Sequence, residues 1–424
     1  MSLRCGRRLA LCLRPTILVS LAVFAPSFVS CLSAQNTVAP VPLLASGQPV
    51  NWWFVFKFNS QSFPGCGGGF ERECPFGGTV QRYSSFSQQF LFASSTNGSL
   101  QQGVGCAGDT IADPVGATFD QVYNGGFFYV LWNDQFYGDP LASAFAPAGH
   151  SKGMLAWNSD GDGMVMQVST PSWPGSGSAS DPRKTDGNTL GCVLDNNVLV
   201  SQQFFALKLN KADVMTVLQA MTNSSVVTDP ANPQIVNNGG PPEIQVLVNG
   251  LGIISASKTA TRVALSSGVL LISKPSHLNV PPWQMVSALL GGESLRVASW
   301  WASPEIPTTT AATPIACWDP SLGKPGAVAI ATTGTWQGTS LGFEGVAEPD
   351  GNHAKIGVSA SEGRRGFFGR PFVIFGDMNQ SGALSGPGCD SSQNGRGGLF
   401  FVIPNNLPLF HSVSSLLQGD TAPQ

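Results

Sequence analysis

The sequence predicts a strand-rich α/β protein built from two similar halves, and three observations support this prediction. Charged residues make up only 11% of the 424 residues, while the chain contains 50 glycines and 31 prolines. That composition is typical of short strands joined by many turns and long loops. Several apolar runs have the length of strands buried on both faces of a sheet. A His-x-Lys pair also occurs twice, about half a chain apart.

The expected strands and helices follow from local patterns. Short apolar runs predict strands at 51–59, 90–94, 127–132, 204–210, 244–248 and 295–301. One helix is expected to begin after the N-cap Asn210, and a second to run from Pro281–Pro282 to Gly291–Gly292. The turn-rich segment 222–243 is expected to join the two halves, which are placed at residues 45–225 and 240–410.

The N-terminus is typical of an export signal. Four arginines precede an apolar run at 16–30 that is short for a membrane span, and cleavage is expected near Ala34. The protein is therefore expected to be secreted or periplasmic, or lysosomal in a eukaryote, and Cys31 leaves a lipid-anchored form open. Loss of four arginines and no acidic residue takes the formal charge from −3 to −7. A globally basic surface is excluded, so a polyanion requires a local cleft of Lys and Arg.

The cysteines indicate an oxidising compartment rather than a metal site. Six remain after the signal, at positions 66, 74, 106, 192, 317 and 389, which allows up to three disulfides, and Cys66–Cys74 is a possible local pair. No metal or other cofactor is expected. The segment NSDGDG (158–163) is interpreted as a hairpin turn, since a calcium loop needs a distal acid that is missing. Burial in the core is favoured over base stacking for Trp52, Trp53 and Phe54.

The repeated pair is the strongest chemical signal. His150 and Lys152 lie in GHSKG, and His353 and Lys355 lie in NHAKIG; each pair is followed by a strand, a turn, a strand and a polar tip. In a strand, residues i and i+2 point to the same side. If the halves pack about a pseudo-twofold axis, the two pairs face each other across one cleft. His277 and His411 have no such company and are expected to be structural or exposed.

This arrangement suits in-line displacement at a phosphodiester. One neutral imidazole attacks phosphorus, the other protonates the leaving oxygen, and the lysines stabilise charge on the non-bridging oxygens. No metal is required. Since one histidine must be charged, a mildly acidic pH is expected.

Several segments resemble the deoxyribonuclease II family, a branch of the phospholipase D-like phosphodiesterases. They are NWWFVFKFN (51–59), VLWNDQ (130–135), GHSKG (149–153), SQQFFALKL (201–209), LRVASW (295–300), NHAKIGVS (352–359), FGDMN (375–379) and RGG (396–398). The resemblance implies a duplicated phospholipase D-like α/β sandwich with one active site between its halves. It also implies metal-independent DNA hydrolysis at acid pH that leaves 3′-phosphate and 5′-hydroxyl ends. The Gly/Ser-rich insertions point to a bacterial member.

The resemblance also implies roles for individual residues. The catalytic set is His150, Lys152, His353 and Lys355, with His353 expected as nucleophile and His150 as general acid. Asn379 is expected to position substrate and Asp377 to orient a member of a dyad, with Ser169 or Ser172 in the matching role in the first half. Arg364, Arg365 and Arg370 either bind DNA phosphates or solvate an exposed loop. The family's Asp six residues after the first Lys is Asn158 here, and Asp160 or Asp162 is the expected substitute.

Three functions remain open at this point. The first is a secreted acid endonuclease with DNA as substrate. The second is a phosphodiesterase of the same chemistry that acts on a phospholipid, and the third is an exported binding protein without catalysis. A basic groove favours DNA, whereas a deep apolar pocket favours lipid. The chain is expected to be a monomer or a homodimer.

Overall fold

The first of two large β-sheets contains eight strands. The computed structural model describes residues 38–65, 71–73, 79–81, 89–137, 141, 144–183, 199–360 and 371–424, of which 71–73 and 79–81 are described by their backbone. The strand order is β10 (Val236–Asn237), β6 (Phe128–Asn133), β7 (Lys152–Trp157), β8 (Gly163–Val168), β9 (Gln202–Leu209), β1 (Trp52–Lys57), β4 (Phe90–Ser94) and β5 (Gln101–Gln102). Every neighbouring pair is antiparallel.

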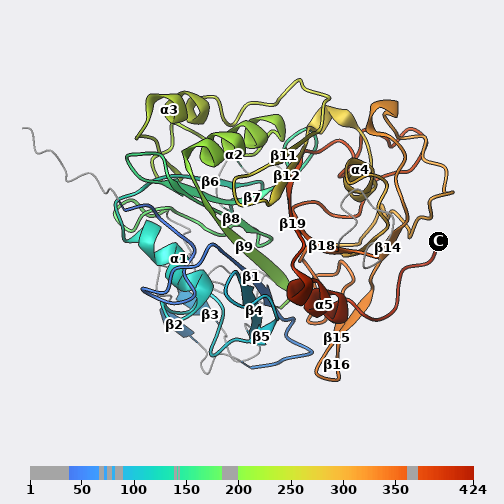
Figure 1. The fold of residues 1–424 in the computed structure, drawn as a ribbon, viewed down its shortest axis with the longest axis horizontal. Helices are drawn as coiled ribbons and strands as arrows, with labels where there is room; N and C mark the ends of the chain where they lie inside the picture. The colour runs from blue at the N-terminus through green and yellow to red at the C-terminus, as the bar shows by residue number, and fades with distance from the viewer. Residues whose placement is uncertain are drawn as a thin grey trace, which may run out of the picture. The chain divides into compact units, whose positions relative to one another are not determined.

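The second large sheet contains seven strands and lies beside the first (Figure 1). Its order is β11 (Thr261–Ala264), β12 (Leu270–Lys274), β19 (Gly398–Pro404), β18 (Phe372–Gly376), β17 (Ile356–Ser359), β13 (Leu295–Ala298) and β14 (Val328–Ile330). Only the pair β13–β14 is parallel within this sheet. Two hairpins complete the described strands: β15 (Thr333–Trp336) with β16 (Thr339–Gly342), and β2 (Glu71–Glu73) with β3 (Thr79–Gln81).

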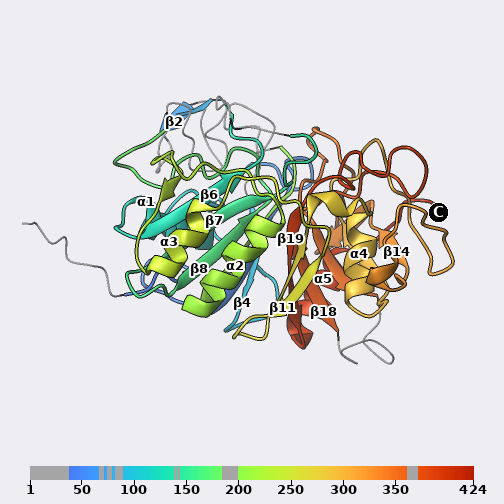
Figure 2. The same cartoon turned by 90° about the horizontal axis from the view of Figure 1, so that it is seen from above.

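Five α-helices occur in the part of the chain that the structure describes. They are α1 (Pro114–Tyr123), α2 (Lys211–Asn223), α3 (Pro242–Asn249), α4 (Pro282–Leu289) and α5 (Leu407–Leu416), with 3-10 turns at Ser276–Leu278 and Pro320–Leu322. Helix α2 packs on β8 and β9, and α5 packs on β17 and β18. Figure 2 shows α2 and α3 over the strands of the first sheet. The predicted fold class, a strand-rich mixed α/β sandwich, is confirmed.

The two sheets repeat one arrangement of strands. The run β6-β7-β8-β9-β1 in the first sheet corresponds to β13-β17-β18-β19-β12 in the second. In each sheet the strand β9 or β19 is followed directly by a helix, α2 or α5. Residues 36–424 form a single unit, and the bounds 45–225 and 240–410 for two halves stay predictions.

Aromatic side chains pack the two sheets together. Phe375 of β18 stacks on Phe54 of β1 with ring centroids 4.4 Å apart, and on Phe205 of β9 at 4.7 Å. Phe205 also contacts Phe401 of β19 at 5.5 Å. All four rings are fully buried. Because aromatic pairs bury large areas in defined geometries, this cluster holds β1 and β9 of the first sheet against β18 and β19 of the second.

Most predicted elements are present, and one is wrong. The runs at 51–59, 90–94, 127–132, 204–210 and 295–301 contain β1, β4, β6, β9 and β13, and both predicted helices occur as α2 and α4. The run 244–248, however, lies in helix α3 and is not a strand. Ile244 and Val248 are buried one turn apart while Val246 is 70% exposed, and Pro242 occupies the first turn. The residues are amphipathic at helical spacing, which a five-residue apolar run conceals.

Other interpretations from the sequence hold. Trp52, Trp53 and Phe54 are buried in β1, and residues 158–163 form the β7–β8 hairpin turn. His277 and His411 are exposed. Segment 222–243 contains the end of α2 and strand β10, which pairs with β6 at the edge of the first sheet, and its role in joining two halves stays a prediction.

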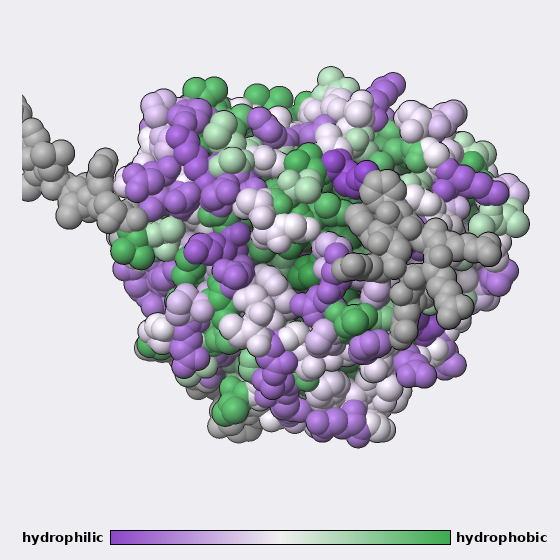
Figure 3. All heavy atoms as spheres, in the orientation of Figure 1, coloured by the Kyte–Doolittle hydropathy of each residue, from purple (hydrophilic) through white to green (hydrophobic). Residues whose placement is uncertain are grey.

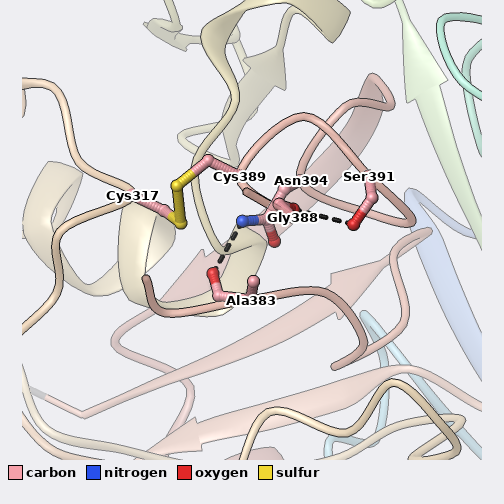
Figure 4. Close-up of a disulfide and its surroundings, with 6 residues drawn as sticks. All are labelled: Cys317, Ala383, Gly388, Cys389, Ser391 and Asn394. Atoms are coloured by element: carbon pink, nitrogen blue, oxygen red, sulfur yellow. Dashed lines mark hydrogen bonds between the residues drawn. A yellow bond between two sulfur atoms is a disulfide. The ribbon is translucent and has the colours of Figure 1, made fainter. Parts of the chain in front are cut away.

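A disulfide between Cys317 and Cys389 fastens the loop that joins β18 to β19 (Figure 4). Beside it, Asn394 donates a side-chain hydrogen bond to the Ala383 carbonyl at 2.7 Å. Cys106 is also disulfide-bonded. Cys66, Cys74 and Cys192 lie outside the described residues, as do Cys31 and the predicted signal segment 1–34.

The visible surface is mixed in character. Figure 3 shows hydrophilic and hydrophobic residues interspersed over one face of the molecule. Exposed large apolar side chains, such as Val104 and Phe145, are spread along the sequence. Among the described residues, no helix has the length and apolar content needed to span a bilayer.

Candidate active site

The two His-x-Lys pairs occupy equivalent places in the two sheets. His150 comes just before β7, which begins at Lys152, and His353 comes just before β17, which begins one residue after Lys355. Lys152 is the first residue of its strand, while His150, His353 and Lys355 precede β7 and β17, so the prediction that each pair lies along a strand is wrong. All four residues nevertheless lie close together. Each lysine is near enough for its charge to lower the pKa of both histidines.

Each imidazole is held by the other half of the chain. His150 Nδ1 donates to the backbone carbonyl of Asp377 at 2.7 Å, and His353 Nδ1 donates to that of Ser169 at 2.8 Å. Ser169 directly follows β8, and Asp377 directly follows the equivalent strand β18. Since a carbonyl oxygen can only accept, Nδ1 carries the proton and Nε2 presents a lone pair in the neutral ring.

The backbone of each histidine is held in the same reciprocal manner. The His150 amide donates to the Gly397 carbonyl at 2.7 Å, and the His353 amide donates to the Ser201 carbonyl at 2.7 Å. Gly397 and Ser201 immediately precede β19 and β9, which are equivalent strands. Both the ring and the main chain of each histidine are thus fixed by the opposite half.

Both histidines line one cavity of about 360 Å³. The lining contains polar and charged groups as well as aromatic rings: Asp134, Gln135, Tyr137, Ala144, His150, Pro171, Val200, Trp300, Ala347, His353, Asn379, Gln393 and Arg396. Trp300 meets the His353 ring edge-on with centroids 4.8 Å apart. Within the described chain, the buried Asn379 Oδ1 has no hydrogen-bond partner, so this side chain is available to a ligand in the cavity.

A buried ion cluster supports the first pair. Lys152 Nζ lies 2.5 Å from Asp134 Oδ1, and the Arg396 guanidinium lies 2.8 Å from Asp134 Oδ2. Arg396 also donates to the carbonyls of Ala144, Ala148 and Gly149, which precede His150. The cluster therefore joins the loop before β19 to the loop before β7.

Asp134, not Asp160 or Asp162, is the acidic partner of Lys152. Asn158 lies at the far end of β7, where its side-chain oxygen accepts the amides of Asp160 and Asp162 within the hairpin turn. Asp162 in turn accepts the amide of Lys211. A strand of six residues separates this turn from the dyad by about 17–20 Å. The replacement of Asp by Asn at position 158 thus leaves the charge balance of the dyad intact.

Burial and positive charge set the protonation of the site. The pKa of His150 is held well below 6.5, mainly by burial and further by the charges of Lys152, Arg396 and Lys355. Burial, then the charges of Lys355 and Lys152, does the same to the pKa of His353. Burial and the charge of Lys152 also hold the pKa of Lys355 well below its usual value. Both imidazoles are therefore neutral at pH 7.

The Asp377 carboxyl is buried. Gln167 Nε2 donates to its Oδ1 and the Leu399 amide to its Oδ2, both at 3.0 Å. Burial raises the pKa of Asp377 to about 7 in spite of these bonds. Asp377 thus reaches His150 through its backbone while its side chain joins β8 to β19.

A scan against protein-family models matches residues 30–407 to deoxyribonuclease II. The match covers most of the chain. The chain belongs to the deoxyribonuclease II family. It is therefore a hydrolase of the nuclease type, as the resemblance implied. No curated protein matches the chain.

Within this family member, the remaining predicted site residues are placed as follows. Ser169 is buried, its hydroxyl donates to Gln202 at 2.6 Å and its carbonyl accepts from His353, and its role toward a substrate stays a prediction. The Ser172 hydroxyl accepts the amide of Tyr137 at 3.1 Å. Arg364, Arg365 and Arg370 lie outside the described residues. Among the described residues, no group of three or more His, Cys, Asp and Glu side chains is arranged to hold a metal ion.

Two important residues were not assigned from the sequence. Asp134 lies in VLWNDQ and Arg396 in RGG, segments that resemble the family but carry no pattern of spacing that links them to the dyads. They are 262 residues apart, and only the packing of the two halves brings them together. The signal that could have found Asp134 is an acidic residue at the end of a fully apolar strand.

We expect Asp134→Asn to lower the free energy of unfolding by about 3–5 kcal/mol. Removal of the carboxylate leaves the cations of Lys152 and Arg396 buried without a counter-charge. Urea unfolding at pH 7 measures the change. Glu243→Gln is the control, because its ion pair with Lys211 is exposed and contributes little. An effect of Asp134→Asn as small as that of the control would contradict the role of the cluster.

Proposed function

We propose that this deoxyribonuclease II family member is an exported, metal-independent acid endodeoxyribonuclease that acts through a phosphohistidine. The observation that carries the proposal is the pair of histidines lining one cavity, each with Nδ1 bonded to a carbonyl of the opposite half. This leaves two Nε2 atoms as the reactive positions of the site. The proposed products are 3′-phosphate and 5′-hydroxyl ends.

The reaction proceeds in two displacements. One Nε2 attacks phosphorus and the bond from phosphorus to the 5′ oxygen breaks, while the second imidazole, protonated, gives its proton to that oxygen. The second imidazole, now neutral, takes a proton from water, which attacks phosphorus and breaks the phosphorus–nitrogen bond. The first histidine is released and the 3′-phosphate remains. His353 as nucleophile and His150 as general acid stay a prediction.

The cations and the amide supply the stabilisation of charge. Lys152 and Lys355 act on both histidines electrostatically, so they also act on a phosphate placed between them. Preorganised donors in a buried site need no reorganisation as charge develops on the non-bridging oxygens. Asn379, whose buried oxygen has no protein partner among the described residues, is assigned to orient the substrate.

The lining of the cavity supports a nucleic acid over a lipid substrate. Charged and amide groups such as Asp134, Gln135, Gln393 and Arg396 surround the histidines. A lipid phosphodiester requires a deep apolar pocket for its acyl chains, which this lining does not provide. DNA presents phosphates that a local cationic site can bind even when the whole chain is acidic.

Export is proposed from two observations. Residues 1–34 have the composition of a signal segment, and Cys317 and Cys389 form a disulfide. Disulfides of this kind persist in oxidising compartments.

We expect the protein to nick plasmid DNA at pH 5 in EDTA, and His150→Ala and His353→Ala each to lower the rate by more than about 10⁴-fold. Loss of either ring removes the covalent route as well as acid–base assistance. His277→Ala, which changes an exposed histidine, is the matched control and should retain wild-type activity. Loss of wild-type nicking in EDTA would contradict metal independence, and nicking by both variants would remove the dyads from the mechanism.

We expect kcat/KM for DNA cleavage to fall as pH rises, with the midpoint of the fall below pH 6.5. The free enzyme must hold one protonated imidazole, and burial with nearby cations depresses the pKa of both rings. The rate should fall roughly tenfold per pH unit above that midpoint. A pH series of initial rates measures the profile. A midpoint above pH 6.5 would show that the free site does not depress these pKa values.

A further inference from the structure

Two buried lysines outside the His-x-Lys pairs occupy equivalent positions. Lys57 is the last residue of β1, and Lys274 is the last residue of the equivalent strand β12. Lys57 pairs in register with Gln202 of β9, and Lys274 pairs with Gly398 of β19, the first residue of the strand in both cases. Both lysine side chains are fully buried.

Each ammonium contacts the chain two residues before its register partner. Lys57 Nζ donates to the Val200 carbonyl. Lys274 Nζ donates to the Arg396 carbonyl at 2.8 Å and to the Asn394 carbonyl at 2.7 Å. Val200 and Arg396 both line the cavity that contains the two histidines. The two lysines thus hold equivalent segments at the edge of the site.

The next carbonyl along each segment holds a histidine. Ser201, after Val200, accepts the amide of His353, and Gly397, after Arg396, accepts the amide of His150. Lys57 therefore lies one peptide from the anchor of His353, and Lys274 lies one peptide from the anchor of His150.

Burial of an ammonium group is unfavourable, so packing alone does not explain why lysine occupies these two positions. Burial lowers the pKa of Lys274 to about 7, so the charged form is destabilised in this position. An apolar residue of similar length would fill the same space without that penalty. An apolar residue cannot donate to a carbonyl, as Lys57 does to Val200 and Lys274 does to Asn394 and Arg396, next to the residues that hold the histidines.

We infer that Lys57 and Lys274 are positioning residues, each of which fixes one active-site histidine through the adjacent carbonyl, Lys57 for His353 and Lys274 for His150. The inference concerns the site of the proposed function and rests on it for any effect on catalysis. That each lysine positions one histidine does not depend on whether the substrate is DNA.

NMR of the histidine rings tests this assignment without a cleavage assay. The sequence contains four histidines, so ring Cε1–H signals of His-labelled protein are few, and single His→Gln variants assign them. The exposed His277 and His411 serve as internal references. Each ring is titrated from pH 4 to pH 8 in wild type, Lys57→Met and Lys274→Met, with Lys208→Met, an exposed lysine on β9, as the control.

Lys274→Met should raise the pKa of His150 by about half a unit or more and leave that of His353 nearly unchanged. Lys57→Met should do the reverse. The shift is upward because a loosened ring becomes better solvated and returns toward its ordinary value near 6.5. Loss of a nearby positive charge would also raise the pKa of a histidine. Lys274→Gln removes the same charge but keeps a donor, so a shift of His150 that is larger in Lys274→Met than in Lys274→Gln reports position and not charge.

In cleavage assays, each Met variant should lose about 10–100-fold in kcat with little change in KM, because a misplaced ring impairs the chemical step more than binding. Lys57→Gln and Lys274→Gln, which keep a donor, should recover part of that loss. Equal shifts of both rings, no shift, or ring signals of an unfolded chain in the Met and Gln variants would overturn the inference. If Lys274→Met shifts His150 alone and Lys57→Met shifts His353 alone, but the wild-type protein does not cleave DNA, the result would instead contradict the proposed function.

Discussion

The structure depends on a reciprocal constraint: each half of the chain fixes the histidine of the other half. The ring nitrogens bond to the carbonyls of Asp377 and Ser169, and the histidine amides bond to those of Gly397 and Ser201. Neither half can therefore complete its own dyad. The aromatic cluster around Phe375 sets the sheets against each other, and the ends of β8 and β18 then meet the two histidines. The packing of the two sheets thus determines the orientation of both imidazoles.

The electrostatics of the site follow from the same packing. Burial and concentrated positive charge keep both imidazoles neutral at pH 7. In the proposed mechanism, an entering phosphate supplies the negative charge that allows one of them to protonate. Asp134 limits the excess of cations on one side, where it binds Lys152 and Arg396. An acidic chain can thus contain a site selective for anions, because the cations are gathered in one enclosed place.

Much of this site could be predicted from the sequence, since the two His-x-Lys pairs and the strands around them are local patterns. The strands β1, β6 and β9 were recognisable because they are short apolar runs that are also rich in aromatic residues, which favours a strand over a helix. Helix α3 was not, because residues 244–248 hold only four apolar side chains, too few to show a period. Arg396 and the carbonyl anchors were beyond reach for a different reason: their roles arise from contacts between segments more than 150 residues apart, and a backbone carbonyl leaves no trace in the sequence. Asp134 is only 18 residues from Lys152, but the sequence does not show the pairing of β6 with β7 that brings the two side chains together.

The shared phosphorus atom is the central claim, and a crystal structure with orthovanadate tests it most directly. Vanadate adopts the five-coordinate geometry of phosphorus in an in-line displacement. We expect one vanadate in the cavity, bonded to Nε2 of one histidine and hydrogen-bonded through its opposite apical oxygen to Nε2 of the other. Vanadate bound to a single ring with the second histidine turned away, or separate anions at His150 and His353, would contradict a common reaction centre.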